Sequence, residues 1–135
     1  MTKYSIIPAL LSVSVLIVFA SCRSVPNNPS NGTSAIAGLV LKGPITPDQQ
    51  QGQINEAPLV GAPVTITNSV NSTVVVKVVS DTAGKFFVSV AAGSYILTPG
   101  QISNSGLPRP LGPSMIQVPA NTTVADTLHY DTGIR

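Results

Sequence analysis

The chain has 135 residues, of which 9% are charged and 4% aromatic, with 12 Pro and 11 Gly. This composition excludes a helical bundle or a coiled coil, because those folds need long uninterrupted stretches of Ala, Leu, Glu and Lys. One His and one Glu leave little material for acid–base catalysis. A net charge of +2 without any basic cluster argues against nucleic acid as a partner.

Residues 1–21 have the features of a secretory signal peptide. Lys3 provides a basic start, and residues 6–20 form an uncharged apolar run that contains Pro8. Fifteen helical residues extend about 22 Å, which is short of the roughly 30 Å hydrocarbon core of a bilayer. We therefore expect a signal peptide that is removed rather than a permanent transmembrane helix.

The end of this segment contains the only Cys of the chain. Phe19-Ala20-Ser21-Cys22 resembles the lipobox of bacterial lipoproteins, with Phe19 where Leu is usual. The resemblance implies that the Cys22 thiol carries a diacyl group, that the mature chain bears further acyl chains such as palmitate, and that Cys22 becomes the new N-terminus. Because Arg23 is not the Asp that commonly retains lipoproteins in the inner membrane, the outer membrane is expected in a Gram-negative cell. A plain secretory signal or a retained anchor is the alternative.

A polar segment, residues 22–33, follows the signal peptide. It is rich in Pro, Asn and Ser and has almost nothing to bury, which is typical of a disordered tether. We expect residues 34–135 to form one domain of about 100 residues.

Apolar residues in this domain alternate with a period of two, which predicts β-strands. We expect strands at 35–41, 63–67, 73–80, 85–91, 94–98, 115–118 and 122–130, separated by turn-forming residues. This pattern predicts an all-β fold, a seven-stranded antiparallel β-sandwich. The expected core comprises Ile36, Val40, Val64, Ile66, Val74, Val76, Val78, Phe86, Val88, Val90, Tyr95, Leu97, Val124 and Leu128. Asp126 shares the inward parity of its strand, so we expect it near a sheet edge or beside a bulge.

The spacing of residues 61–97 is that of a known module. Gly61-Ala62-Pro63-Val64-Thr65-Ile66, then Asp81-Thr82-Ala83-Gly84-Lys85-Phe86, then Gly93-Ser94-Tyr95-Ile96-Leu97 resembles the carboxypeptidase regulatory-like domains, which are transthyretin-like sandwiches. In this pattern Asp81 and Gly84 form a tight turn, with Gly84 able to adopt a positive φ. The loops 43–59 and 99–113 are longer than in a minimal module. The resemblance implies a domain that accompanies enzymes but carries no active site.

Enzyme chemistry finds no support in the motifs. The chain has no Gly-x-Ser-x-Gly elbow, no His-Glu-x-x-His and no Cys-x-x-Cys, so we expect neither catalysis nor a bound cofactor or metal. His129 and Asp131 share a strand face but offer two ligands, whereas a catalytic zinc needs three from the protein. We expect His129 to be an exposed strand residue.

Two further segments invite a chemical interpretation. Asp131-Thr132-Gly133 and Arg135 predict an Asx-type turn that pins the last strand, with Arg135 pairing a carboxylate; a binding epitope is the alternative. Similar sandwich domains of bacterial adhesins join a first-strand Lys to a last-strand Asn or Asp by an isopeptide bond. That resemblance would pair Lys42 with Asp126, assisted by the chain's only Glu, against the simpler expectation of an exposed Lys42.

Together these features predict a non-catalytic, lipid-anchored module of the cell envelope that contacts another envelope protein. A carbohydrate-binding module is the alternative. Sugar platforms use exposed aromatic rings, and alternation assigns Phe86 and Tyr95 to the core. Only Phe87 and Tyr130 remain for such a platform, so the sequence favours protein interaction. The ligand or partner and the oligomeric state are not encoded in any motif.

Overall fold

The structure is a computed structural model that describes residues 33–48 and 52–135. The expected signal peptide, Cys22 and most of the expected tether lie outside the described residues. The described chain forms strands β1 (Ser34–Gly43), β2 (Ala57–Pro58), β3 (Pro63–Asn68), β4 (Val74–Val79), β5 (Lys85–Val90), β6 (Gly93–Pro99), β7 (Arg109–Pro110), β8 (Ser114–Val118) and β9 (Thr123–Asp131). Over these residues, no helix is long and apolar enough to cross a membrane.

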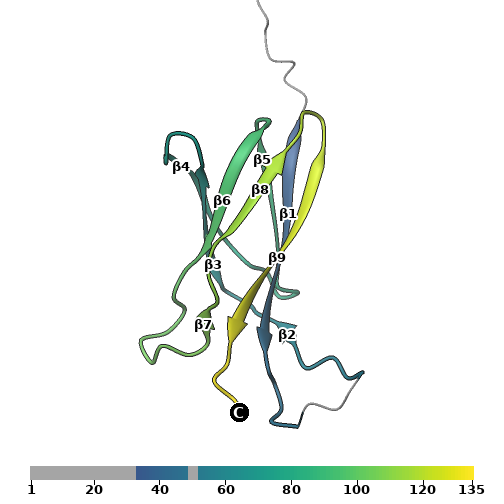
Figure 1. Cartoon of the computed structure of the whole chain (residues 1–135), viewed down its shortest axis with the longest axis vertical. Coiled ribbons are helices and arrows are strands. Elements are labelled where there is room, and N and C mark those ends of the chain that lie inside the picture. The colour runs from purple at the N-terminus through teal and green to yellow at the C-terminus, as the bar shows by residue number, and fades with distance from the viewer. Residues whose placement is uncertain (1–32, 49–51) are drawn as a thin grey trace, which may run out of the picture.

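The strands form two sheets that pack face to face (Figure 1). The first, called the β1 sheet, has the order β2-β1-β9-β7, and β5 also pairs with β1. The second, called the β3 sheet, has the order β4-β3-β6-β8. The predicted all-β sandwich is therefore confirmed.

The seven longer strands are the seven expected ones, displaced by at most two residues at either end. The sequence missed β2 and β7, which lie in the long loops 43–59 and 99–113. Each adds two residues to an edge, Ala57–Pro58 beside β1 and Arg109–Pro110 beside β9. Two-residue strands that contain Pro carry no detectable alternation, which is why periodicity did not reveal them.

The first and last strands pair in parallel, in register from Ala35 opposite Thr123 to Gly43 opposite Asp131. All other pairs of described strands are antiparallel. The expectation of a fully antiparallel sandwich is thus wrong for this pair. A hairpin connection forces antiparallel pairing, but β1 and β9 are separated by the whole domain and have no such constraint. Both strands run from the end that bears residue 33 to the opposite end (Figure 1).

Most of the expected core is buried between the sheets, but Val74 is not. Ile36, Val40, Ile66 and Leu97 are fully buried, whereas Val74 is 53% exposed. The β3–β4 register shifts between Ile66 and Thr67, so that Val76 lies opposite Ile66 and Val74 opposite Thr67. This bulge adds a residue to β4 and turns Val74 out of the core.

Four core residues had not been expected from the sequence: Leu59, Ala62, Val118 and Tyr130. Tyr130 continues the alternation of Val124 and Leu128 and is 1% exposed. Its hydroxyl donates to the Gly100 carbonyl at 2.7 Å, so the polar end of the ring is satisfied inside the sandwich. Burial raises the pKa of this phenol.

Gly38 lies in the middle of β1, where a glycine would ordinarily weaken a strand. Phe86, opposite it on β5, explains the choice. A Cβ on Gly38 would stand 1.9 Å from Cζ of Phe86, because the aromatic ring lies directly over the glycine. The absence of a side chain at Gly38 thus makes room for the Phe86 ring on the core face of β5.

The tight turn expected after residue 80 is present. Oδ1 of Asp81 accepts hydrogen bonds from the backbone N–H groups of Ala83 and Lys85, both at 2.8 Å. Gly84 adopts φ +73°, and any Cβ there would meet the Val40 carbonyl oxygen at 2.6 Å. Glycine is therefore required by both conformation and space.

Candidate interaction site at the C-terminal end

The last strand ends at the end of the sandwich far from residue 33 (Figure 1). A cluster of charged side chains forms at this point. Asp131 is the final residue of β9 and lies opposite Arg109 of β7 in the strand register. The structure thus brings Asp131 and Arg135, singled out in the sequence, together with Arg109 from the 99–113 loop.

Asp131 accepts hydrogen bonds from three groups. Arg135 binds both carboxylate oxygens, at 3.3 Å to Oδ1 and 3.0 Å to Oδ2. Arg109 donates to Oδ2 at 3.0 Å. The Gly133 backbone N–H donates to Oδ1 at 2.9 Å, which closes an Asx-type turn.

These contacts explain the electrostatics of the cluster. The hydrogen bonds from Arg135 and from the Gly133 N–H, with a further one from Arg109, hold the pKa of Asp131 well below its usual range. The hydrogen bond to Asp131 in turn raises the pKa of Arg135. The Asp131 side chain is 9% exposed, whereas those of Arg109 and Arg135 are 58% and 69% exposed. One buried carboxylate therefore orients two guanidinium groups toward solvent.

The turn that follows is anchored to the end of β1. The Thr132 N–H donates to the Gly43 carbonyl at 3.1 Å, and its hydroxyl donates to the Pro44 carbonyl. Gly133 has φ +78°, and a Cβ there would approach Cδ1 of Leu107 to 2.8 Å. The C-terminal segment is thus packed between the two long loops.

His129 lies at hydrogen-bond distance from a carboxylate. Its Nδ1 lies 3.0 Å from Oε1 of Glu56, and both side chains are 42% exposed. No group of three His, Cys, Asp or Glu residues suited to a metal ion occurs within residues 33–48 and 52–135. The contact links β9 to the 43–59 loop, an arrangement that strand parity alone did not reveal.

The register rules out an isopeptide bond between Lys42 and Asp126. Lys42 lies opposite Tyr130, while Asp126 lies opposite Gly38. Four residues of strand separate the two positions, or about 13 Å at 3.3 Å per residue. The hypothesis of this bond is therefore wrong, and the carboxylate assigned to assist it, Glu56, is engaged with His129.

Asp126 points inward, as its parity indicated. It lies in the half of β9 nearer residue 33, where β9 is an edge strand because β7 pairs only with Tyr130 and Asp131. It is partly buried, and its Oδ2 atom is buried without a hydrogen-bond partner. The strand continues without a bulge at this position, since the β1–β9 register is unbroken. Of the two explanations foreseen for Asp126, the sheet edge is the correct one.

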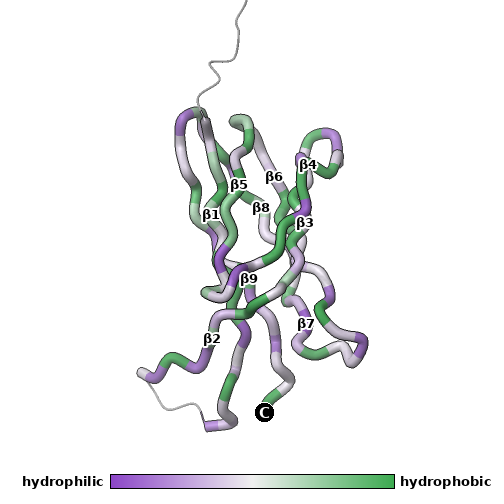
Figure 2. The backbone as a smooth tube through the Cα atoms, turned by 180° about the vertical axis from the view of Figure 1, so that it is seen from behind, coloured by the Kyte–Doolittle hydropathy of each residue, from purple (hydrophilic) through white to green (hydrophobic). Residues whose placement is uncertain are grey.

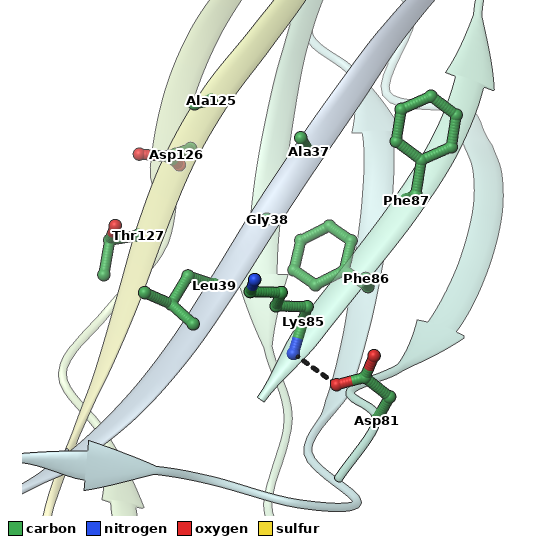
Figure 3. A pocket seen from close by; sticks show the side chains of 10 residues that line it. All are labelled: Ala37, Gly38, Leu39, Asp81, Lys85, Phe86, Phe87, Ala125, Asp126 and Thr127. Atoms are coloured by element: carbon green, nitrogen blue, oxygen red, sulfur yellow. Dashed lines mark hydrogen bonds between the residues drawn. The ribbon is translucent and has the colours of Figure 1, made fainter. Parts of the chain in front are cut away.

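The outer face of the β1 sheet carries a hollow of about 480 Å³ (Figure 3). Small side chains of Ala37 and Ala125 form part of its lining, and Leu39, Lys85 and Phe87 stand around it. Phe87 is 65% exposed, whereas Phe86, Tyr95 and Tyr130 are buried. Within the described residues, Phe87 is therefore the one aromatic ring with a large exposed surface.

Comparison with known proteins identifies the fold but not a family. No family model matches the chain, and no curated protein matches its sequence. Among solved structures it resembles the minor pilin GBS52 of Streptococcus agalactiae, with 14% identity and a TM-score of 0.55 over 75% of this chain and 45% of that one. The shaft pilin SpaA of Lactobacillus rhamnosus GG gives 11% identity and a TM-score of 0.54, over 74% and 50%. The TIE protein of Bacillus anthracis gives 15% and 0.51, over 74% and 17%.

The chain is similar in fold to β-sandwich domains of bacterial pilins. It spans half or less of the length of each of these proteins, so the likeness concerns one domain of a larger molecule. The shared feature is the two-sheet sandwich, which the alternation of apolar residues predicted and which the resemblance to carboxypeptidase regulatory-like domains also implied.

Arg109 is the component of the cluster that the sequence did not reveal. It stands in a Pro-rich loop without periodicity, and only the folding of that loop onto β9 brings it to Asp131. Asp131, Gly133 and Arg135 were found because they lie within five residues and form a local turn. A local signal is readable from sequence, whereas a partner 22 residues away is not.

Proposed function

We propose that this protein is a non-catalytic module of the bacterial cell envelope, anchored by lipid on Cys22, which contacts another envelope protein through the end of the sandwich that bears Asp131. The observation that carries the proposal is the parallel pairing of β1 and β9. It places residue 33, the last residue of the expected tether, at one end of the sandwich and the loops 43–59 and 99–113 at the other (Figure 1).

The arrangement suits presentation of a surface away from a membrane. A tether of residues 22–33 spans at most about 40 Å when fully extended, and β1 adds about 33 Å along the sandwich. The distal end displays the two exposed guanidiniums and exposed apolar side chains such as Ile45 and Ile54. Exposed Arg with neighbouring apolar surface is the composition enriched at protein interfaces.

The similar solved structures support a role in protein interaction. Two are described as a minor pilin and a shaft pilin, names that denote parts of a surface assembly. The carboxypeptidase regulatory-like resemblance and the lipobox point to the same kind of module.

The anchor is tested by the Cys22→Ala variant in the native host, with Ser24→Ala as a matched neighbour. We expect the wild type and Ser24→Ala to incorporate labelled acyl chains and to be recovered in the membrane fraction. Cys22→Ala should lose both properties. A Cys22→Ala protein that remains in the membrane fraction at mature size would show that lipid on Cys22 is not the anchor.

The distal contact is tested by photo-crosslinking from two equally exposed apolar positions. Ile54 lies in the 43–59 loop, whereas Val70 lies in the β3–β4 turn at the tether end; each is 87% exposed. With p-benzoylphenylalanine in place of either residue, we expect a reproducible adduct with one envelope protein from Ile54 only. Substitution of both Arg109 and Arg135 by Gln should reduce its yield. Adducts of equal yield from both positions would exclude a specific distal contact.

A carbohydrate-binding role remains the second candidate because Phe87 stands beside the hollow on the β1 sheet (Figure 3). An exposed ring beside a concave surface is suited to stack on a sugar. A glycan array gives the test: binding that is lost in Phe87→Ala and kept in Met115→Ala, a similarly exposed apolar residue on β8, would establish this function. An array without hits would eliminate it.

A further inference from the structure

The outer strand of the β3 sheet, β4, has a free edge and an incompletely covered core face. β4 pairs with β3 alone among the described strands, so one row of its N–H and C=O groups has no strand partner. Its sequence is Val-Val-Val-Lys-Val-Val, without Pro or Gly. Hydrophobic colour runs along this strand at the lateral edge of the molecule (Figure 2).

The inward-pointing side chains of β4 are more exposed than their direction predicts. Val76 and Val78 point between the sheets yet are only partly buried, in contrast to Val64 and Ile66 on the adjacent β3. On the outer face, Val75 and Val79 are 47% and 61% exposed. Both faces of the strand therefore have apolar surface that an additional strand would cover.

The other free edges are less suited to accept a strand. β8 is bracketed by Pro113 and Pro119, and the upper edge of β9 carries the inward-pointing carboxylate of Asp126. Proline and inward-pointing charge both discourage edge pairing. On β5 the inward side chains are already buried, with Phe86 at 7% and Val88 at 9% exposure. At β4 the protective features are Lys77 and the bulge at the start of the strand, and residues 76–79 beyond the bulge pair regularly with β3.

We propose that β4 is a docking edge for an extended segment of another protein, with apolar residues at alternate positions and a carboxylate opposite Lys77. Strand addition satisfies the unpaired backbone groups, and the alternate apolar residues extend the core face beyond Val76 and Val78. The carboxylate neutralises the single charge on the outer face, since opposite charges on directly facing strand positions are favourable.

A second copy of this chain is a poorer occupant. Antiparallel self-pairing of β4 about Lys77 would set two ammonium groups opposite each other, which is unfavourable. A two-fold axis relating antiparallel copies of β4 also turns one sandwich end over end. The two tethers would then leave from opposite ends of the dimer, although both anchors belong in one membrane. This last argument rests on the proposed lipid anchor; the edge and charge arguments do not.

A charge-swap experiment tests the proposal on the full chain. The probes are two synthetic peptides, acetyl-Thr-Val-Thr-Val-Glu-Val-Thr-Val-amide and the same peptide with Lys for Glu, titrated while the backbone amides are followed by NMR. We expect the Glu peptide to shift amides of β4 and to slow their hydrogen exchange. Lys77→Glu should weaken that binding by about two- to fivefold and strengthen binding of the Lys peptide by a similar factor. Met115→Glu on the opposite edge should change neither.

Several results would overturn the proposal. These are the absence of β4 shifts at millimolar peptide, shifts centred on another strand, or an unchanged preference between the two peptides in Lys77→Glu. Sedimentation that shows self-association through β4, disrupted by substitution of Val75 with Lys, would assign the edge to a second copy instead. The crosslinking from Ile54 reads the distal loops, so either result stands without the other.

Discussion

Phe86 and Gly38 form a contact whose energy can be measured by a double-mutant cycle. The ring of Phe86 lies over Gly38 across the β1–β5 pair and is 7% exposed. Phe86→Ala removes the ring and leaves a cavity, a change that costs about 3–5 kcal/mol in a protein core. Phe87→Ala, on the outer face at 65% exposure, should cost at most about 0.5 kcal/mol.

Gly38→Ala makes the opposite change, because it adds a methyl group where none fits. With its Cβ 1.9 Å from Cζ of Phe86, the ring must move, and such overpacking costs about 1–3 kcal/mol. In the Phe86→Ala background the methyl group enters the vacated space. Ala also suits a strand better than Gly by about 0.5–1 kcal/mol. Gly38→Ala should therefore destabilise the wild type and stabilise the Phe86→Ala variant, with a coupling energy of about 1.5–4 kcal/mol.

The assay is equilibrium urea unfolding of the wild type, both single variants and the double variant, compared at equal m-values. Gly93→Ala is the matched glycine control, since its Cβ would meet the Tyr95 ring at an ordinary 3.6 Å. If Phe86→Ala does not fold, Phe86→Leu replaces it and retains the sign of the coupling. Equal costs for Gly38→Ala in the two backgrounds would refute the contact between the ring and the glycine.

Three further predictions concern buried polar groups. Ser80→Ala should cost about 1–3 kcal/mol in thermal unfolding, because the buried hydroxyl accepts from the Ala62 N–H and donates to the Leu59 carbonyl, whereas exposed Ser89→Ala should cost little. Tyr130→Phe should cost about 0.5–1.5 kcal/mol, and a free energy of unfolding equal to the wild type would mean that the hydroxyl bond contributes nothing. The lowered pKa of Asp131 stabilises the fold at pH values above the unfolded-state pKa near 3.8, and this contribution is lost as the pH falls below that value toward the lower pKa of the folded state. Asp131→Asn should therefore be less stable at neutral pH and depend less on pH in that window; parallel curves for the two proteins would contradict this.

The elements readable from the sequence are those with local signals. Alternation located the seven longer strands, and it assigned Phe86 inward and Phe87 outward, as the structure confirms. The turn at Asp81 and Gly84 was found for the same reason, since its hydrogen bonds close within four residues. Alternation continued past Leu128 would also have placed Tyr130 in the core.

The features that the sequence did not reveal depend on long-range pairing. The orientation of β9 beside β1, the approach of Arg109 to Asp131 and the contact of Glu56 with His129 each join segments that no short motif connects. The misassignment of Val74 has a similar origin. A bulge arises from how β4 registers with β3, so strict alternation along β4 alone assigns the wrong face.

The parallel β1–β9 pair also determines how the module would carry load between its two ends. If lipid on Cys22 holds residue 33 and a partner holds the end of β9, tension pulls the two strands along their axes in opposite directions. The register runs unbroken from Ala35 opposite Thr123 to Gly43 opposite Asp131, so the ladder bonds resist this shear together rather than one after another. At the distal end, Thr132 bonds to Gly43 and Pro44, which ties the last strand back to the first. The pairing that was not foreseen is thus the feature best suited to a tethered interaction module.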